Sequence, residues 1–176
     1  MTASEIFESV TGSGSSDFAT LVGILNRHGE WCLIGGLAVN CYVEPVYTLD
    51  ADIVVVASEL PNIRNELLAA GFSVEAFPHS LNARMAKSDL RIQFKLDPRY
   101  QQFVNDSQLQ YVLGQKVPVA SLTNVVRGRT WAWQDEKRRL SKRKKDELDL
   151  IRIAEAYPDV LHLIPAGIRE QLEENN

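Results

Sequence analysis

The feature that most constrains the fold of this chain is a glycine pair followed by two closely spaced aspartates. Gly35 and Gly36 end one apolar segment, and Asp50 and Asp52 open a second one, which continues as Ile-Val-Val-Val. Residues i and i+2 of a strand point to the same face, so the two carboxylates are expected roughly 6–7 Å apart. The pattern therefore predicts a backbone bend that another group can approach closely, opposite a pair of acidic side chains.

This arrangement suits a nucleotide and a metal ion, although each motif alone also has a plain structural explanation. Glycine lets a backbone approach a phosphate closely, and a helix that begins behind Gly35 and Gly36 would offer free N–H groups. Asp50 and Asp52 repel one another, and Mg²⁺ between them would relieve the repulsion and hold a nucleoside triphosphate. Thr48 precedes the acids at a suitable place for a turn or a phosphate contact. The alternatives are a simple strand-to-helix turn at the glycines and a solvent-exposed strand end at the acids.

The order of predicted elements is helix, strand, helix, strand, helix, several strands and then only helices. We predict strands over 31–34, 50–56, 72–77, 82–87, 90–96, 109–113 and 117–119. We predict helices over 16–27, 37–42, 60–70, from 122 onward and over 146–156, with a breaker at 11–16 and a loop at 100–108. This order is typical of an α+β or mixed α/β fold. We expect an α/β core over residues 1–120 and a C-terminal helical segment, residues 121–176, packed on that core.

Composition points to a globular chain in a reducing compartment. Net charge is −4 and the pI is about 5.4, so the whole molecule does not attract nucleic acid by charge alone. Cys32 and Cys41 lack the spacing of a zinc site. Residues 1–9 contain acids and no apolar core, and no apolar run approaches the roughly 18 residues of a membrane span. We therefore expect a cytoplasmic protein without a membrane partner.

A basic cluster lies near the C-terminal end, where every residue of Lys137–Lys145 except Leu140 and Ser141 is basic. At helical spacing Arg138, Lys142 and Lys145 align on one face, which predicts contact with RNA phosphates. Four acidic neighbours offer the alternative of a solvated, neutralised helix face: Asp135, Glu136, Asp146 and Glu147.

The glycine pair followed by Asp50-x-Asp52 resembles the signature of the polymerase-beta-like nucleotidyltransferases. Residues 117–122, followed by a helix and then by Arg143-Lys-Lys-Asp-Glu-Leu-Asp-Leu150, are similar to the end of the AbiE-type minimal nucleotidyltransferases, which include toxins of bacterial toxin–antitoxin pairs. Together the matches cover roughly residues 17–156. The resemblance implies a nucleotidyltransferase-type α+β fold: a short mixed β-sheet flanked by helices.

The resemblance also implies roles for the matching positions. Asp50 and Asp52 would be catalytic residues that bind Mg²⁺, while Gly35 and Gly36 would face the triphosphate. The implied reaction is Mg²⁺-dependent transfer of a nucleoside monophosphate from a nucleoside triphosphate to a hydroxyl of RNA, protein or a small molecule. An antitoxin protein is the implied partner.

Two further roles follow from the downstream match. Lys145 would be a catalytic residue that approaches a phosphate. Asp146 or Asp149 would orient Lys145 or the acceptor, and Asp149 would also be a nucleotide-binding residue. Because Lys145 and Asp149 are four residues apart, they share a helix face, and a routine surface ion pair is the alternative.

One position departs from the family. The family places a third carboxylate on a later strand, where this chain has Gln93, and Asp89 and Asp97 only flank that strand. An amide cannot take a proton from an attacking hydroxyl. The alternative function is therefore a catalytically impaired nucleotide- or RNA-binding module of the same fold, and a third is a partner-binding protein that acts through the basic helix. The family lysine on the helix after residue 121 is replaced by Arg127 or Arg129.

Overall fold

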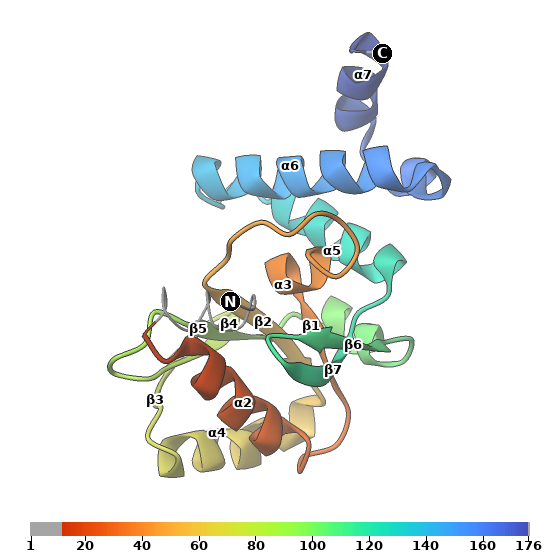
Figure 1. The fold of residues 1–176 in the computed structure, drawn as a ribbon. Coiled ribbons are helices and arrows are strands. Elements are labelled where there is room, and N and C mark those ends of the chain that lie inside the picture. Colours follow the sequence, from red (N-terminus) through yellow and green to blue (C-terminus); the bar gives the residue numbers. More distant parts are fainter. Residues whose placement is uncertain (1–11, 176) are drawn as a thin grey trace.

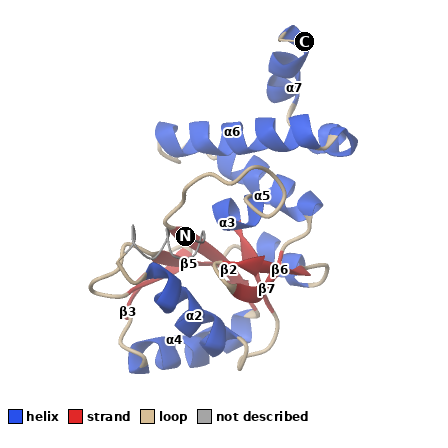
Figure 2. Cartoon of the chain, in the orientation of Figure 1, coloured by secondary structure: helices blue, strands red, loops and turns tan. Residues whose placement is uncertain are grey.

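The computed structural model describes residues 12–175, which form a mixed seven-stranded β-sheet with helices on both faces (Figure 1; Figure 2). The strands are β1 Trp31–Ile34, β2 Asp50–Val55, β3 Ser73–Phe77, β4 Ser80–Arg84, β5 Arg91–Lys95, β6 Gln108–Val112 and β7 Gln115–Val119. The α-helices are α2 Gly14–Leu25, α3 Gly35–Val39, α4 Leu60–Ala69, α5 Leu122–Gln134, α6 Leu140–Ala156 and α7 Ala166–Glu174. Three 3-10 helices are η1 Ala57–Glu59, η2 Pro98–Val104 and η3 Pro158–Leu163. The predicted α+β class with a mixed sheet is confirmed.

The centre of the sheet brings together segments that are distant in the sequence. The strand order is β3-β4-β5-β2-β1-β7-β6; β2 is antiparallel to β1 and parallel to β5. In this register Asp52 lies opposite Ile34 on one side and Gln93 on the other. The end of β1 and the beginning of β2 therefore meet at the same place, beside β5.

Helices cover both faces of this centre, which explains why all four residues of β1 are buried. In Figure 1, α2 and α4 lie on one face of the sheet, while α3, α5 and α6 lie on the other. The apolar side of α2 contributes Phe18, Leu21 and Leu25, each at most 1% exposed. On the opposite face α3 contacts β1 and β2, and α5 contacts α3 and α6.

Several predicted boundaries are confirmed and others are wrong. The strand over 31–34 is confirmed, and Ser121 caps α5 as its Oγ accepts from the Asn124 N–H (3.3 Å). The first helix begins at Gly14 instead of Ser16, so residues 14–16 belong to the helix and not to a breaker; Thr11 lies outside the described residues. The helix expected over 37–42 is α3, which includes both glycines and ends at Val39.

The segment predicted as a loop over 100–108 contains most of η2. Tyr100 and Phe103, three residues apart, share a side of this 3-10 helix and pack against Trp131 of α5, with ring centroids 5.2 and 5.5 Å from the indole. Asp97 caps the helix by accepting from the Arg99 N–H (3.0 Å). Aromatic packing across elements, rather than local periodicity, orders this segment.

The helix predicted over 146–156 begins earlier, at Leu140, so most of the basic cluster lies in its first turns.

Within residues 12–175, none of the helices combines the length and apolar composition that a membrane crossing requires. The division of the chain at residue 120 stays a proposal.

Replacing Leu33 with alanine should lower the free energy of unfolding by about 2–5 kcal/mol. Leu33 is 0% exposed in the central strand β1, so truncation leaves a cavity that its neighbours cannot fill completely. Urea unfolding measures the loss. Leu109→Ala is the matched control, because Leu109 is 62% exposed, and should change stability by less than about 0.5 kcal/mol. Equal losses in both variants would contradict the central place of β1.

Candidate nucleotide-binding site

The glycine bend lies directly against Asp52, the second residue of the acid pair. Gly35 has φ +70°, and a Cβ added there would lie 2.1 Å from Oδ2 of Asp52. A Cβ added at Gly36 would lie 3.3 Å from both Thr48 Oγ1 and an Nη atom of Arg129. The absence of side chains at both positions therefore lets the backbone approach a carboxylate, a hydroxyl and a guanidinium. Gly35 and Asp52 line the smaller of the two cavities described below, whereas Gly36 and Thr48 are buried.

The helix behind the glycines is shorter than the sequence predicted. Because α3 has only 5 residues, starting at Gly35, its aligned peptide dipoles are few. The bend therefore brings the backbone close to its neighbours, but its helix dipole is weak.

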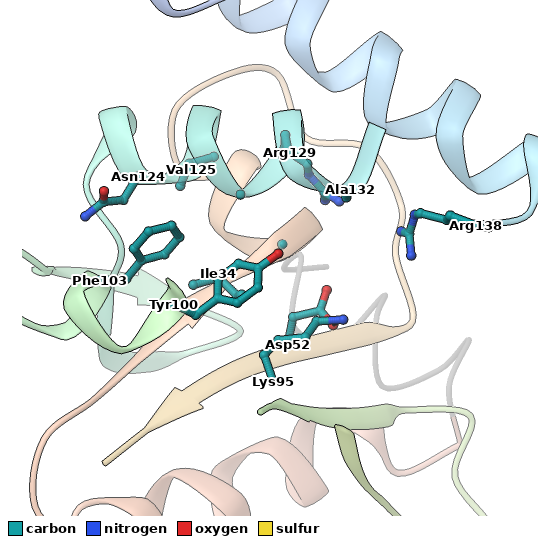
Figure 3. A pocket seen from close by; sticks show the side chains of 12 residues that line it. Ile34, Asp52, Lys95, Tyr100, Phe103, Asn124, Val125, Arg129, Ala132 and Arg138 are labelled. Atoms are coloured by element: carbon teal, nitrogen blue, oxygen red, sulfur yellow. The ribbon is translucent and has the colours of Figure 1, made fainter. Parts of the chain in front are cut away.

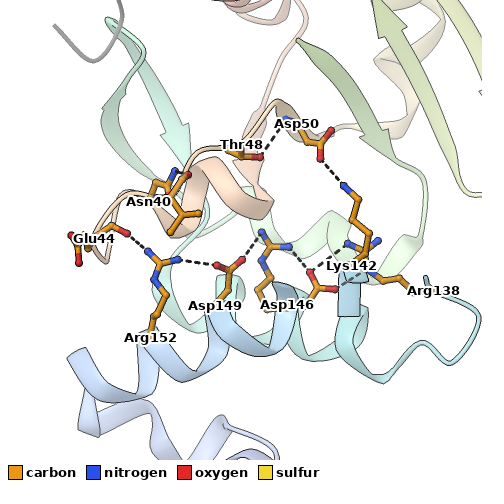
Figure 4. A network of polar contacts seen from close by, with 11 residues as sticks. Asn40, Glu44, Thr48, Asp50, Arg138, Lys142, Asp146, Asp149 and Arg152 are labelled. Carbon is orange, nitrogen blue, oxygen red and sulfur yellow. Dashed lines mark hydrogen bonds and ion pairs between the residues drawn. The ribbon is translucent and has the colours of Figure 1, made fainter. Parts of the chain in front are cut away.

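Each acid of the pair is met by cationic side chains. The Asp50 carboxylate accepts from Arg91 Nε (2.7 Å) and Lys142 Nζ (3.1 Å), and it lies beside α6 in Figure 4. Lys95 Nζ is 3.4 Å from Asp52 Oδ1. The side chains of Asp50 and Asp52 are 26% and 15% exposed, so solvent reaches both. Thr48 Oγ1 accepts from the Asp50 N–H (3.3 Å), which fixes the loop just before β2.

Gln93 lies next to Asp52 in the parallel pairing of β2 with β5. Its Oε1 accepts from Lys95 Nζ (2.6 Å). Asp97 binds the Arg99 guanidinium (2.7 Å), which lowers the pKa of Asp97. Over residues 12–175 there is no cluster of three or more His, Cys, Asp or Glu side chains that could hold a metal ion. The described chain therefore offers two carboxylates at this place.

A buried network of charges joins α5 and α6 behind the glycines (Figure 4). Arg129, 7% exposed, contacts Asp146 (2.8 Å) and Asp149 (3.1 Å). Arg138 also binds Asp146 (2.7 Å), and Arg152 binds both Asp149 (3.0 Å) and the Glu44 carbonyl. Burial raises the pKa of Asp149, and Arg129 and Arg152 oppose that rise. This network fixes the guanidinium of Arg129 against Gly36.

Lys145 lies half-buried on α6, where the charges of Arg129, Asp149, Asp50 and Lys142 act on it. Burial and then the Arg129 charge lower the pKa of Lys145. The structure therefore brings Lys145 into the electrostatic environment of Asp50. Asp149 lies deeper, in the buried network with Arg129.

Two cavities adjoin the acid pair. The larger, about 570 Å³, is in the range of small-molecule sites. Its charged lining consists of Arg84, Arg91, Lys95, Arg138 and Lys142 with Asp50, Asp52 and Glu75. The smaller, about 40 Å³, lies between β2 and α5, where Figure 3 shows Asp52 and Lys95 on the sheet side and Arg129 on the helix. Burial, and then the Asp52 charge, raises the pKa of Tyr100 in its lining to about 12, which keeps the phenol neutral.

Sequence reasoning did not single out Arg91 or Lys95. A signal was present, because positions 91, 93 and 95 alternate along one strand and share a face. The alternation places these side chains near the acids only if this strand pairs with the strand that carries Asp50. The sequence does not show that pairing. Arg129 was noted only as a substitute for a family lysine, and the structure places it against Gly36.

No protein-family model and no curated protein matches the sequence of this chain. Solved structures do match its fold. The solution structure of the antibiotic-resistance factor ANT(2'')-Ia has a TM-score of 0.60 at 12% identity, covering 91% of this chain and 93% of that chain. An antigenic nucleotidyltransferase-like protein from Paracoccidioides brasiliensis has a TM-score of 0.56 at 14% identity, over 94% and 90% of the two chains. The lincosamide antibiotic adenylyltransferase LnuA, bound to lincomycin, has a TM-score of 0.51 at 16% identity, over 77% and 94%.

These similarities establish the fold of the chain as that of the nucleotidyltransferases. At such low identities they establish the fold alone, and the chemistry has to be argued from the residues of this chain.

Replacing Gly35 with alanine should destabilise the protein and displace the Asp52 carboxylate. The positive φ alone costs about 1–2 kcal/mol for a residue with a Cβ, and the overlap with Asp52 adds to that. Urea unfolding measures the effect. Gly167→Ala is the matched control, because a Cβ there meets nothing within 4 Å; it should be neutral or stabilising by up to about 1 kcal/mol. An unchanged Gly35→Ala protein would refute the close packing of the bend.

Replacing Asp146 with alanine should cost about 3–5 kcal/mol, because two guanidinium groups then lose a buried partner. The Asp146 side chain is 1% exposed and binds both Arg129 and Arg138. Chemical unfolding gives the change. The matched control is Glu136→Ala in the exposed linker before α6, which should stay within about 0.5 kcal/mol of the parent.

Proposed function

We propose that this chain is a Mg²⁺-dependent nucleotidyltransferase that transfers a nucleoside monophosphate from a nucleoside triphosphate to a hydroxyl group. The observation that carries the proposal is the contact of the Gly35 backbone with the Asp52 carboxylate, beside Asp50. Asp52 lines the larger cavity together with Asp50 and the smaller one together with Gly35, so the glycine backbone and the two carboxylates meet at Asp52, which suits a phosphate chain and its cation.

Asp50 and Asp52 fit Mg²⁺ as a partial ligand set. Mg²⁺ is commonly held by one or two carboxylates together with substrate phosphates and water, so two acids suffice when the triphosphate supplies further oxygens. Both carboxylates line the cavity of about 570 Å³, where a nucleotide has room. When bound, Mg²⁺ would neutralise charge on the phosphoryl oxygens. Lys142, now 3.1 Å from Asp50, would then turn toward the phosphates, while Lys95 would stay beside Asp52.

The residues of the chain would position the reaction as follows. Gly35 and Gly36 allow the triphosphate to lie along the backbone, with Thr48 beside it, and Arg129 and Lys145 supply positive charge from α5 and α6. The acceptor oxygen attacks the α-phosphorus and forms a new P–O bond, while the bond to the bridging oxygen breaks. Pyrophosphate leaves with that electron pair, and the acceptor proton is lost to solvent. Holding the groups in line and stabilising the developing charge are the protein's main contributions.

The acceptor and partners belong to the same proposal. The hydroxyl is one of an RNA, a protein or a small molecule, and we propose RNA contact along Arg138, Lys142 and Lys145 at the start of α6. In the free protein Arg138 and Lys142 bind Asp146 and Asp50. An antitoxin protein is a proposed partner on the basis of the sequence resemblance, and the reducing cytoplasm is the proposed location.

A catalytically impaired nucleotide-binding module is the second candidate, and one observation favours it. Gln93 occupies the strand position beside Asp52 and receives a hydrogen bond from Lys95 (2.6 Å), so that position offers an amide and an ammonium instead of a carboxylate. Such a module would keep its affinity for nucleotides and lack turnover.

The double variant Asp50→Asn/Asp52→Asn should lose nucleotide transfer by at least about 100-fold, because the metal ligands and their charge are removed together. The assay incubates the protein with Mg²⁺, each α-phosphate-labelled nucleoside triphosphate, and total RNA, protein and a small-molecule extract, and then counts the label transferred to each of the three fractions. Asp159→Asn, an exposed change on η3, is the matched control and should retain full transfer. Label that persists in the double variant would remove this site from the reaction.

A thermal shift separates the two candidates. Both predict that Mg²⁺ with the preferred triphosphate raises the melting temperature, because a ligand that binds only the folded state stabilises it. Stabilisation without label transfer selects the impaired module, whereas stabilisation with transfer selects the enzyme.

A further inference from the structure

Lys95 lies beside Gln93, the position at which the acid pair would receive a third carboxylate. Gln93 is the neighbour of Asp52 in the parallel pairing, and Lys95, two residues later, points to the same face of β5. Its Nζ lies 2.6 Å from Gln93 Oε1 and 3.4 Å from Asp52 Oδ1, and its side chain is 23% exposed. The ammonium group is therefore held between the strand that carries the acids and the strand beside it.

The same ammonium group faces both cavities. Lys95 lines the larger one together with Asp50 and Asp52, and also the smaller one beneath α5 (Figure 3). A positive charge at this point lies next to the space in which a phosphate chain would bind.

The two carboxylates supply ligands for one divalent cation, together with the phosphates, once Lys142 turns away from Asp50. Asp52 packs through Oδ2 against Gly35, and the two Asp50 oxygens contact Arg91 and Lys142. Within the described part of the chain no third acidic or sulfur ligand joins these two carboxylates. Two-metal phosphoryl-transfer sites hold two ions about 3.5–4 Å apart and need enough carboxylates to bind both ions. An ammonium at 3.4 Å from Asp52 opposes a second divalent ion by direct repulsion.

We propose that Lys95 supplies, as a fixed ammonium, the positive charge that a second divalent ion would otherwise supply, so that the nucleotide-bound site takes one metal ion. This inference rests on the proposed function, since it concerns the same nucleotide site. Lys95 is thereby a substrate-contacting cation that neutralises phosphoryl charge, and Gln93 is a positioning residue that orients it through its amide oxygen.

The test counts metal ions directly and does not depend on turnover. The full chain is titrated with Mn²⁺ in the presence of a saturating α,β-methylene nucleoside triphosphate, taking the adenosine, guanosine, cytidine and uridine forms in turn. Electron paramagnetic resonance measures free Mn²⁺. The parent protein should bind one nucleotide-dependent ion per chain, and Gln93→Asp/Lys95→Thr should bind two.

A single substitution covers the case in which the double variant does not fold. Lys95→Met should bind Mn²⁺ about ten-fold more tightly than the parent, because removing one positive charge near Asp52 removes its repulsion of the ion. Lys116→Met is the matched control: it removes one positive charge from an exposed position of β7 and should leave Mn²⁺ affinity unchanged. Thermal melting confirms that each variant is folded.

The outcomes are distinct. Two ions bound to the parent protein, a folded double variant that stays at one ion, or a Lys95→Met affinity equal to the parent's would each overturn the inference and leave the proposed function standing. A parent protein that binds no nucleotide-dependent ion would overturn the proposed function, and the inference with it.

Discussion

The contact between the Gly35 backbone and the Asp52 carboxylate is the constraint on which the rest of the site depends. Antiparallel pairing of β1 with β2 sets Ile34 opposite Asp52, so the chain must turn at the next residue directly over that carboxylate. No side chain fits there, since a Cβ would lie 2.1 Å from Oδ2. Once the turn is made, Gly36 comes against Thr48 and Arg129.

The buried charge network contributes geometry more than net stability. Pairs such as Arg129 with Asp146 and Asp149 lose hydration when buried, and their attraction offsets that loss only in good geometry. The network fixes the position of α5 relative to α6. The Arg129 guanidinium, held by two carboxylates, can lie in only a few orientations. In the observed orientation it points toward Gly36. Lys145, half-buried on α6, lies where the charge of Asp50 acts on it.

The sequence predicted those parts of the site that arise from local patterns. The glycine pair and the acids at i and i+2 are readable because strand alternation and glycine's freedom act over a few residues. The burial of Asp146 was not readable, because a charged residue within a basic run is typical of a solvated helix face. Lys95 was also missed, since its contact with Asp52 depends on which strand pairs with β2. The ordered η2 segment depended on packing against Trp131, which lies far along the chain.

The salt bridge from Lys142 to Asp50 spans 92 positions of sequence. During vectorial synthesis on the ribosome, the strand that carries Asp50 therefore emerges well before the cation that caps it. Until α6 leaves the exit tunnel, the acidic edge of β2 lacks this counter-charge from the chain itself. Arg91, which emerges earlier, is therefore the first of the two cations available to Asp50, and Lys142 joins it only once α6 is in place.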